Sequence, residues 1–483
     1  MPRSGSAIAT ASTRGRKSSK RSSSESRNTS RNQSNENKEC PSADPVATPI
    51  KSSQDTVDKP KKTFDMQGKL SEAQRTLGPI VYSLFLIFLP YWSIFFIFNR
   101  DAKDMKSIMY ANFPRAYQTY LQCPVITVVF VFLMSTLGFT KFDCLGSKYG
   151  VTHNTRKFEL SKNGLPLFGV VLGCSLFLNI GAIQKAFTRP DALILTNMPT
   201  LLTSFVIACF LLSFFSFFEF NSSKYLKGQR NTYLDYTLGR DVRPFVFGID
   251  LKVAVGRVGY LTQTLFIIIM VYSEWEAKKN NPITWFALIR CLILNLDYFV
   301  NEHAMLFSYE FNHQGCGLIY FLEKLLLFPF FFNINDVFYF KMASGNSIES
   351  EWSHFIVYFA VFLVGVTIRR IADNQKFAFK NCPNNPSFKG LKILPSTSKK
   401  ALFADGIWFY ARHPNYFGTI IVFFSTALPF GFSSYIPWIL PIYVMLYLYA
   451  KSFIIENVIK KEYSNAYKEY HRIVPSRIIP IIL

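Results

Sequence analysis

Long apolar runs separated by polar segments dominate the chain after residue 78. Each run is about 17 to 25 residues long, enough for a helix to cross about 30 Å of bilayer hydrocarbon. The pattern predicts about ten transmembrane helices, the last two separated by a turn that contains Pro429 and Gly431. We place them at 78–99, 119–140, 164–183, 198–220, 257–272, 283–300, 317–333 and 352–368, with the final pair within 417–455.

Residues 1–63 have a different composition, rich in Ser, Lys and Arg and poor in aromatic and β-branched side chains. Such a segment buries too little apolar surface to offset the entropy of ordering, so we expect a disordered tail. Its Ser-Arg spacing suits a kinase that would change its charge. Two interpretations stay open, a solvated tail or an electrostatic tether for DNA, chromatin or another anionic partner.

The chain is therefore expected to be an all-α polytopic membrane protein with a disordered basic tail over 1–63 and a transmembrane domain over 64–483. Its net charge is +22, and the Lys and Arg residues are unevenly distributed. With an even number of spans, the basic segments 1–63, 221–256, 369–412 and 451–477 share one side with both termini. The positive-inside rule makes that side cytoplasmic or nucleoplasmic, although the basic loop 100–118 runs against this assignment.

The eight cysteines show no CxxC spacing, and several fall inside predicted spans. The sequence therefore predicts neither a metal site nor a disulfide framework.

Two polar groups of residues lie within or beside apolar runs. Residues 408–418, WFYARHPNYFG, are costly to desolvate beside a membrane span and predict a site for an anionic ligand. The sixth span contains Arg290, Asn295 and Asp297, which either line a wet interior or form an Arg-Asp pair that fixes helix packing. The connector 231–252 alternates charge and glycine, and by itself fits any amphipathic surface loop.

Five blocks together resemble the sterol reductase family, which includes the sterol C14 reductases and the lamin B receptor. The resemblance covers about 400 residues, from the first span to the C-terminus. The matching blocks are Leu238-Gly239-Arg240, 247–252 (FGIDLK), Asn374-Gln375-Lys376, 412–416 (RHPNY) and 474–480 (VPSRIIP). A basic Ser-Arg tail is similar to the lamin B receptor branch, whose folded N-terminal reader domain has no counterpart here. Residence in the nuclear inner membrane or the endoplasmic reticulum membrane is implied.

This resemblance also implies an NADPH site in the C-terminal half, about 300–483, beside a sterol cavity open to lipid. Cationic side chains suit phosphates, His and Asn suit ribose or carboxamide groups, and aromatic rings suit flat ligands. The implied cofactor-binding residues are Lys376, Lys380, Trp408, Arg412, His413, Asn415 and Tyr416. No GxGxxG turn is present, so a Rossmann domain is not the binder.

Reduction of an isolated sterol double bond needs a proton donor and a hydride. The candidate acids are Glu310 and Tyr416. Several residues depart from the family pattern: Thr419, Ile454 and Ile455 replace charged residues, Gln314 and Glu310 replace aspartates, Lys380 replaces an arginine, and Tyr467 replaces a tryptophan. Losing charge in one pocket weakens the expectation of efficient catalysis.

Three functions stay open. The chain is either a nuclear-envelope tether whose bundle serves as an anchor while the tail binds chromatin or lamina, or an active NADPH-dependent Δ14-sterol reductase, and the two can coexist. A methyltransferase of the isoprenylcysteine carboxyl type is a third alternative, because an Arg-His-Pro-x-Tyr-x-Gly block before a helical hairpin is similar in that family.

Overall fold

The computed structural model describes residues 72–98, 141–144, 158–161, 164–170, 190–218, 232–246, 249–276, 281–344, 352–381, 385–396, 401–432 and 434–480. The tail 1–63, the predicted span 119–140 and residues 171–183 of the third predicted span lie outside these ranges.

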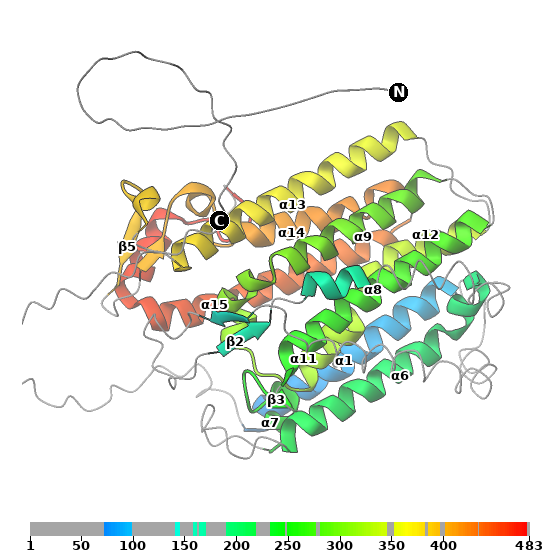
Figure 1. The fold of residues 1–483 in the computed structure, drawn as a ribbon, viewed down its shortest axis with the longest axis horizontal. Coiled ribbons are helices and arrows are strands. Elements are labelled where there is room, and N and C mark those ends of the chain that lie inside the picture. Colours follow the sequence, from blue (N-terminus) through cyan, green and yellow to red (C-terminus); the bar gives the residue numbers. More distant parts are fainter. Residues whose placement is uncertain are drawn as a thin grey trace, which may run out of the picture. The chain divides into compact units, whose positions relative to one another are not determined.

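Long helices form most of the described structure and run side by side in Figure 1. The longest are α1 (Glu72–Phe98), α6 (Pro190–Phe218), α8 (Leu251–Glu276), α9 (Pro282–Val300), α13 (Trp352–Asn381), α14 (Pro414–Ser425) and α15 (Ile436–Ile473). Shorter helices are α7 (Thr232–Leu238), α10 (Tyr309–Asn312), α11 (Leu318–Leu322) and α12 (Ile334–Ser344).

Five helical segments of the described residues are long and apolar enough to cross a membrane. They are Leu251–Ile268, Pro282–Val300, Leu318–Phe340, Trp352–Lys380 and Ile436–Ile473, and shorter apolar helices cover Leu77–Ser93 and Phe205–Phe218. The mostly helical, membrane-spanning class predicted from the sequence is therefore confirmed. The number of about ten helices stays a prediction.

The described residues also contain three short antiparallel hairpins, which the all-α expectation missed. They pair β1 (Lys141–Cys144) with β2 (Phe158–Ser161), β3 (Phe245–Val246) with β4 (Ile249–Asp250), and β5 (Ile393–Pro395) with β6 (Ala401–Phe403). All three lie in connections between the long helices, where the polar sequence gives no helical apolar stripe.

Two predicted spans differ in detail from the structure. The span 317–333 is interrupted, since α11 continues as a π-helical segment (Glu323–Leu327) and then bends before a 3-10 turn (Phe331–Asn333). Pro329 explains the bend, because it donates no backbone hydrogen bond and clashes with the preceding turn. The span 352–368 instead continues to Asn381, so α13 carries polar residues beyond its apolar part.

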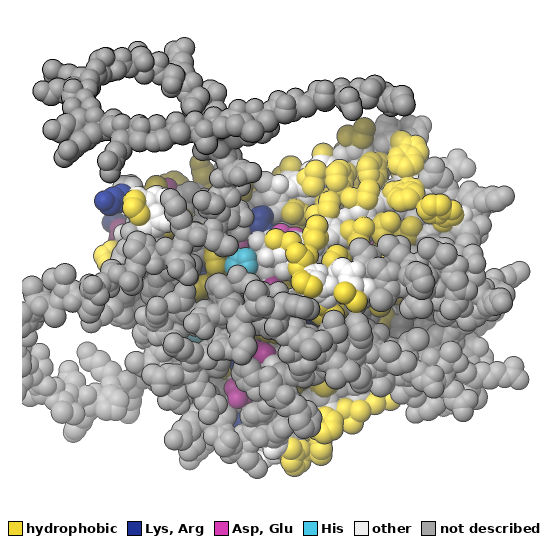
Figure 2. All heavy atoms as spheres, viewed as in Figure 1, with side chains coloured by type: hydrophobic (Ala, Val, Ile, Leu, Met, Phe, Trp, Pro, Cys, Tyr) yellow, Lys and Arg dark blue, Asp and Glu magenta, His cyan; other side chains and the backbone are white. Residues whose placement is uncertain are grey.

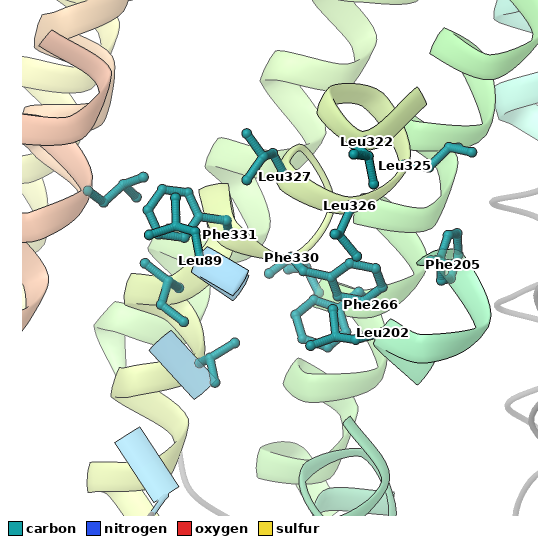
Figure 3. Close-up of a cluster of buried hydrophobic side chains, with 14 of the residues drawn as sticks. Leu89, Leu202, Phe205, Phe266, Leu322, Leu325, Leu326, Leu327, Phe330 and Phe331 are labelled. Carbon is teal, nitrogen blue, oxygen red and sulfur yellow. The ribbon is translucent and has the colours of Figure 1, made fainter. Parts of the chain in front are cut away.

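A buried cluster of Leu and Phe side chains holds α1, α6, α8, α11 and the π-helical segment together (Figure 3). Leu322, Leu325, Phe330 and Phe331 have no exposed surface. Burial of this apolar surface and its close packing tie the interrupted helix into the centre of the bundle.

The outer surfaces of several helices are strongly apolar. In Figure 2, hydrophobic side chains gather along α13, where Ile356, Val357 and Val364 are 68%, 55% and 53% exposed. An exposed apolar face of this extent is what a helix in contact with lipid requires.

Helices α13 and α14 pack with very close backbones. A Cβ atom added at Gly418 would lie 2.6 Å from both the backbone nitrogen of Arg369 and the carbonyl oxygen of Gly365. Small residues at such a contact let helices in membranes approach closely. This contact fixes the block 412–418 against the polar end of α13.

The connector 231–252 is not a simple surface loop. Lys252 is fully buried, and its ammonium group donates to the carbonyl oxygens of Val242, Glu310 and Gln314 at 2.9, 2.5 and 2.5 Å. This one side chain therefore ties the connector to the α10 region, which carries the candidate acid Glu310.

Candidate functional site

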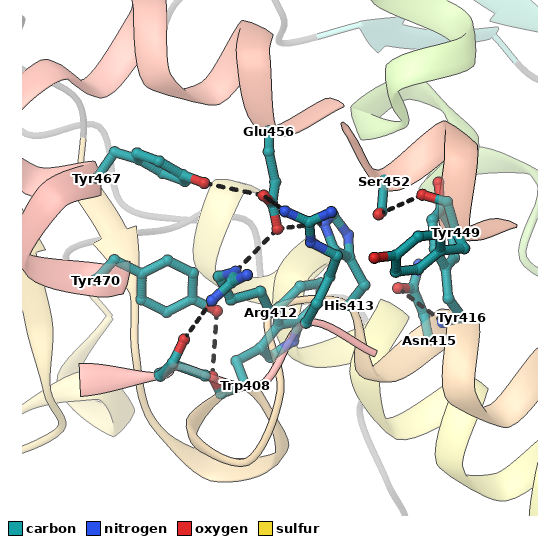
Figure 4. Close-up of polar contacts among 12 residues, drawn as sticks. Trp408, Arg412, His413, Asn415, Tyr416, Tyr449, Ser452, Glu456, Tyr467 and Tyr470 are labelled. Carbon is teal, nitrogen blue, oxygen red and sulfur yellow. Dashed lines mark hydrogen bonds and ion pairs between the residues drawn. The ribbon is translucent and has the colours of Figure 1, made fainter. Parts of the chain in front are cut away.

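Glu456, buried on α15, is the centre of a polar cluster (Figure 4). Its Oε1 accepts from Arg412 Nε at 2.9 Å, and its Oε2 accepts from Tyr467 Oη at 3.1 Å and from Arg477 Nη2 at 3.0 Å. His413 Nε2 lies 3.5 Å from Oε1. One carboxylate thus holds two guanidinium groups and faces an imidazole.

The C-terminal segment Val474–Arg477 lies along Arg412 and His413. Arg412 Nη1 donates to the first two carbonyl oxygens of this segment at 2.8 and 2.6 Å. The backbone N–H groups of Arg412 and His413 donate to the last two at 3.0 and 2.9 Å. Two blocks that carried the family resemblance, 412–416 and 474–480, are therefore one structural unit, and much of Arg412 serves to hold it together.

His413 is a neutral, buried imidazole in this setting. Burial lowers the pKa of His413 below its usual value, and Lys376 and Arg412 lower it further, while Glu456 acts in the opposite direction. Its Nε2 atom has no hydrogen-bond partner within the described part of the chain. The ring stacks on Tyr416 with centroids 5.2 Å apart, so the pair offers a flat surface with a polar edge.

Lys376, on α13, lies above Trp408 of the 3-10 turn Gly406–Phe409, with Nζ 5.9 Å from the ring centroid. Trp408 is held because its Nε1 donates to the carbonyl oxygen of Ala372 at 3.1 Å. Over the residues that the structure describes, Lys376 makes no ion pair, so its charge is available to a ligand. Lys380 lies four residues further along α13 and is half-buried.

Asn415 belongs to the same face, since its Nδ2 donates to Asp373 Oδ1 on α13 at 3.2 Å. Further along α13, Arg369 and Arg370 both pair with Asp297 of α9. Asp297 therefore does not form the packing pair with Arg290 that the sequence left open, because Arg290 pairs with Asp336 of α12.

Glu310 lies in a second charged cluster. Its Oε1 is 2.6 Å from Lys324 Nζ, and its Oε2 is 3.9 Å from Lys451 Nζ. Burial alone would raise the pKa of Glu310, but the two ammonium groups outweigh it and lower the pKa to about 2. Glu310 is thus a carboxylate at neutral pH and carries no proton to donate.

Tyr416 connects the two clusters. It stacks on His413 on one side, and the charges of Lys451 and Glu310 act on its hydroxyl group from the other. Of the two candidate acids, Tyr416 is the one that holds a proton at neutral pH.

Several residues of this site were not found from the sequence. They are Asp373, Arg369 and Arg370 on α13, Lys324 in the π-helical segment, and Lys451 and Glu456 on α15. The sequence did contain a signal for these residues, because charged residues inside apolar runs usually face a bundle interior. Lys451 and Glu456 are the only charged residues of 436–459.

The residues that depart from the family pattern differ in their structural surroundings. Ile454 is 53% exposed on α15, so it points away from the Glu456 cluster. Tyr467 donates to Glu456 and so keeps a hydrogen-bond donor where the family has tryptophan. Thr419 Oγ1 donates to the carbonyl oxygen of Asn415 at 2.9 Å, within the first turns of α14.

The donor set fits a large anion that carries phosphate groups. Lys376, Arg369 and Arg370 all belong to α13, and the Nε atoms of both arginines are buried without a partner in the described residues. Burying such groups without an acceptor is costly, so a ligand with phosphate oxygens suits this face. In the same residues no three His, Cys, Asp or Glu side chains gather as for a metal ion, and Cys209, Cys291 and Cys316 are free thiols.

Fold and site together define a helical membrane protein with a polar interior suited to an anionic cofactor. Residues 78–483 match the model of the Ergosterol biosynthesis ERG4/ERG24 family. The chain belongs to this sterol reductase family. The match includes the connector 231–252, which favours this family over the methyltransferase alternative.

Three relatives illustrate the similarity. The chain is 30% identical over 251 residues to "Delta(14)-sterol reductase" of Arabidopsis thaliana, which covers 51% of this chain and 65% of that protein. It is 28% identical over 245 residues to "Delta(14)-sterol reductase LBR" of Gallus gallus, covering 50% and 38%. It is 26% identical over 315 residues to "Delta(14)-sterol reductase TM7SF2" of Mus musculus, covering 64% and 72%. The matches to the first two relatives thus span less than two thirds of their length.

Proposed function

We propose that this protein is an NADPH-dependent reductase of the Δ14 double bond of a sterol. The main support for the proposal is the position of Lys376. This cation lies above Trp408, is available to a ligand, and belongs to the same face as the Glu456 cluster and Asn415. The cofactor half, about 300–483, contains these residues and Glu310. The proposed transmembrane domain is 64–483.

In this proposal Lys376 binds a phosphate group, assisted by Lys380 at the end of α13. His413 and Asn415 form hydrogen bonds with the ribose or carboxamide groups of the cofactor. Trp408 and Tyr416 provide ring surfaces for its flat parts. Arg412 contributes mainly as the link between the block 412–416 and the C-terminal segment, since Nε and Nη1 are already engaged.

The chemistry assigned to the chain itself is proton transfer. NADPH, when bound, supplies the hydride. Tyr416 Oη gives its proton to one carbon of the double bond, which leaves a carbocation on the other carbon. The Lys451 ammonium group stabilises the tyrosinate that forms. Glu310 keeps Lys324 and Lys451 in place as a carboxylate and does not act as the acid.

Replacing Tyr416 by phenylalanine tests this assignment. We expect sterol turnover to fall at least about 100-fold, as for loss of a general acid, while NADPH affinity changes little because the ring is retained. Turnover by the purified protein in detergent and NADPH binding by fluorescence measure the two effects. Unchanged turnover would remove Tyr416 from the chemistry and leave the cofactor site intact.

We place the protein in the endoplasmic reticulum membrane or the nuclear inner membrane, with both termini on the cytoplasmic or nucleoplasmic side. The uneven distribution of Lys and Arg supports this orientation.

A second role, as a tether, is favoured by the composition of the tail. Clustered Lys and Arg in 1–63, as in RGRKSSKR, bind polyanions through counterion release and need no fold. The proposed partners are DNA, chromatin or the lamina, with a kinase acting on the Ser/Arg-rich segment. This role adds to the reductase activity and does not compete with it.

Binding of the tail to nucleic acid should depend steeply on salt. If about six phosphates are neutralised, raising the salt from 50 to 200 mM should weaken binding by about 1,000-fold. The measurement compares the full chain with a variant lacking 1–63 in nanodiscs, using duplex DNA. Equal binding by the two proteins would contradict the role of the tail.

A further inference from the structure

Glu323, in the π-helical segment Glu323–Leu327, is a carboxylate held by neutral donors. Its Oε1 accepts from Tyr82 Oη of α1 at 3.3 Å and from Tyr447 Oη of α15 at 3.4 Å. Its Oε2 accepts from Gln314 Nε2 at 3.2 Å. π-helical segments occur frequently at functional sites, and here the segment brings a carboxylate to the meeting point of three parts of the bundle.

No cation pairs with this carboxylate in the described residues. The adjacent Lys324 is directed to Glu310, and Lys451 donates to Tyr447 Oη at 3.2 Å. All three donors to Glu323 are uncharged, and its two oxygens hold three long hydrogen bonds. A carboxylate has about four lone-pair positions, so Glu323 has capacity for a further donor.

Two buried polar atoms beside Glu323 have no hydrogen-bond partner among the residues that the structure describes. They are Tyr443 Oη and the Oε1 atom of Gln314. Tyr443 lies close to Tyr82, whose hydroxyl group is a donor to Glu323. A buried hydroxyl without a partner costs free energy, and a native structure rarely leaves one without a reason.

The surroundings of these atoms are apolar and aromatic. The ring of Tyr443 lies 5.0 Å from Phe331 and 6.3 Å from Phe85, measured between centroids. Glu323 and Tyr443 are only half-buried, whereas Phe331 is fully buried. The arrangement is thus a small polar group at the edge of an aromatic core, which suits a ligand that is apolar except for one hydroxyl group.

We propose that Glu323, Tyr443 and Gln314 form the subsite for the hydroxyl group of the sterol. The ligand hydroxyl donates to the Glu323 carboxylate and accepts from Tyr443 Oη, and the sterol rings pack on Phe85, which is 41% exposed. The ligand class rests on the proposed function. The subsite itself rests on the unpartnered atoms and the neutral donors around Glu323.

Sterol binding by the full-length protein tests the subsite without requiring turnover. The probes are a 3-hydroxysterol with a C14 double bond and the 3-deoxy analogue of the same sterol. We expect the wild-type protein to bind the hydroxysterol at least about tenfold more tightly, because a site built to bond a hydroxyl group rejects the analogue that lacks it. Tyr443→Phe should lose most of this preference.

The substitution Tyr443→Phe is suited to the test because it removes only a hydroxyl group, one for which the described residues provide no well-formed hydrogen bond. The thermal stability of the ligand-free variant should equal or exceed that of the wild type. Tyr449→Phe is the matched control, since Tyr449 lies on the same helix and is 50% exposed, and it should keep the preference. Glu323→Gln provides a second variant that keeps the shape and weakens the acceptor, and it should also lower the preference.

The outcomes separate this inference from the proposed function. The subsite would be overturned, and the reductase left standing, if the protein reduced the sterol but bound the two probes equally. The same conclusion would follow if the preference survived in Tyr443→Phe and Glu323→Gln. A hydroxyl preference that depends on Tyr443, in a protein without turnover, would support the subsite and contradict the reductase.

Discussion

Replacing Glu456 by glutamine is expected to destabilise the protein by about 3–5 kcal/mol, the usual cost of removing one partner from a buried ion pair. The variant keeps the shape of the side chain but leaves the buried Arg412 and the half-buried Arg477 without a counter-charge. The free energy of unfolding, measured in mixed detergent micelles by circular dichroism, reports the loss.

Glu469→Gln is the matched control, in the part of α15 that follows the kink at Ser464. Glu469 pairs with Arg472 at 2.8 Å on the surface, where the side chains are 43% and 78% exposed. Exposed pairs of this kind contribute about 0–1 kcal/mol. Equal stability of the two variants would mean that the Glu456 cluster does not hold the block 412–416 to the C-terminal segment.

Replacing Lys376 by alanine is expected to weaken NADPH binding by about 10- to 100-fold, the range for a hydrogen bond to a charged group of about 1.5–3 kcal/mol. Lys376 makes no ion pair in the described structure, so its removal leaves no unbalanced charge. Stability should therefore change little, in contrast to Glu456→Gln. Titration of the purified protein with NADPH measures the affinity.

Lys389→Ala serves as the control for this second variant. Lys389 is an exposed lysine in the loop that follows α13, so it changes the net charge by the same amount away from the site. A tenfold loss of affinity in both variants would point to a general electrostatic effect and not to a phosphate contact at Lys376.

The apolar pattern of the sequence identified most of the helices because their length and composition follow from the bilayer itself. It did not locate the interruption of the span 317–333. There Pro329 bends the chain, and Glu323 begins a π-helical segment whose partners come from α1 and α15. Contacts between residues more than 100 positions apart decide such a feature, and local sequence does not report them.

The candidate site was predicted in part. The block 408–416 and Lys376 lie together as the family resemblance implied, but the role of Arg412 is mainly to bind Glu456 and the C-terminal carbonyl groups. Glu456 lies directly after Ile454 and Ile455, the positions that suggested a decayed site. The charged residue of the cluster, Glu456, is therefore one position after Ile455. Only the direction of the side chains on α15 distinguishes Glu456 from the two isoleucines.

The proposed catalytic competence is best tested by reaction of the purified wild-type protein with a Δ14-sterol and NADPH deuterated at the transferred position. We predict a product reduced at the C14 double bond that carries one deuterium atom, and its formation should require NADPH. A protein that is folded and binds NADPH, yet forms no labelled product, would contradict the reductase assignment and leave the bundle as a membrane anchor.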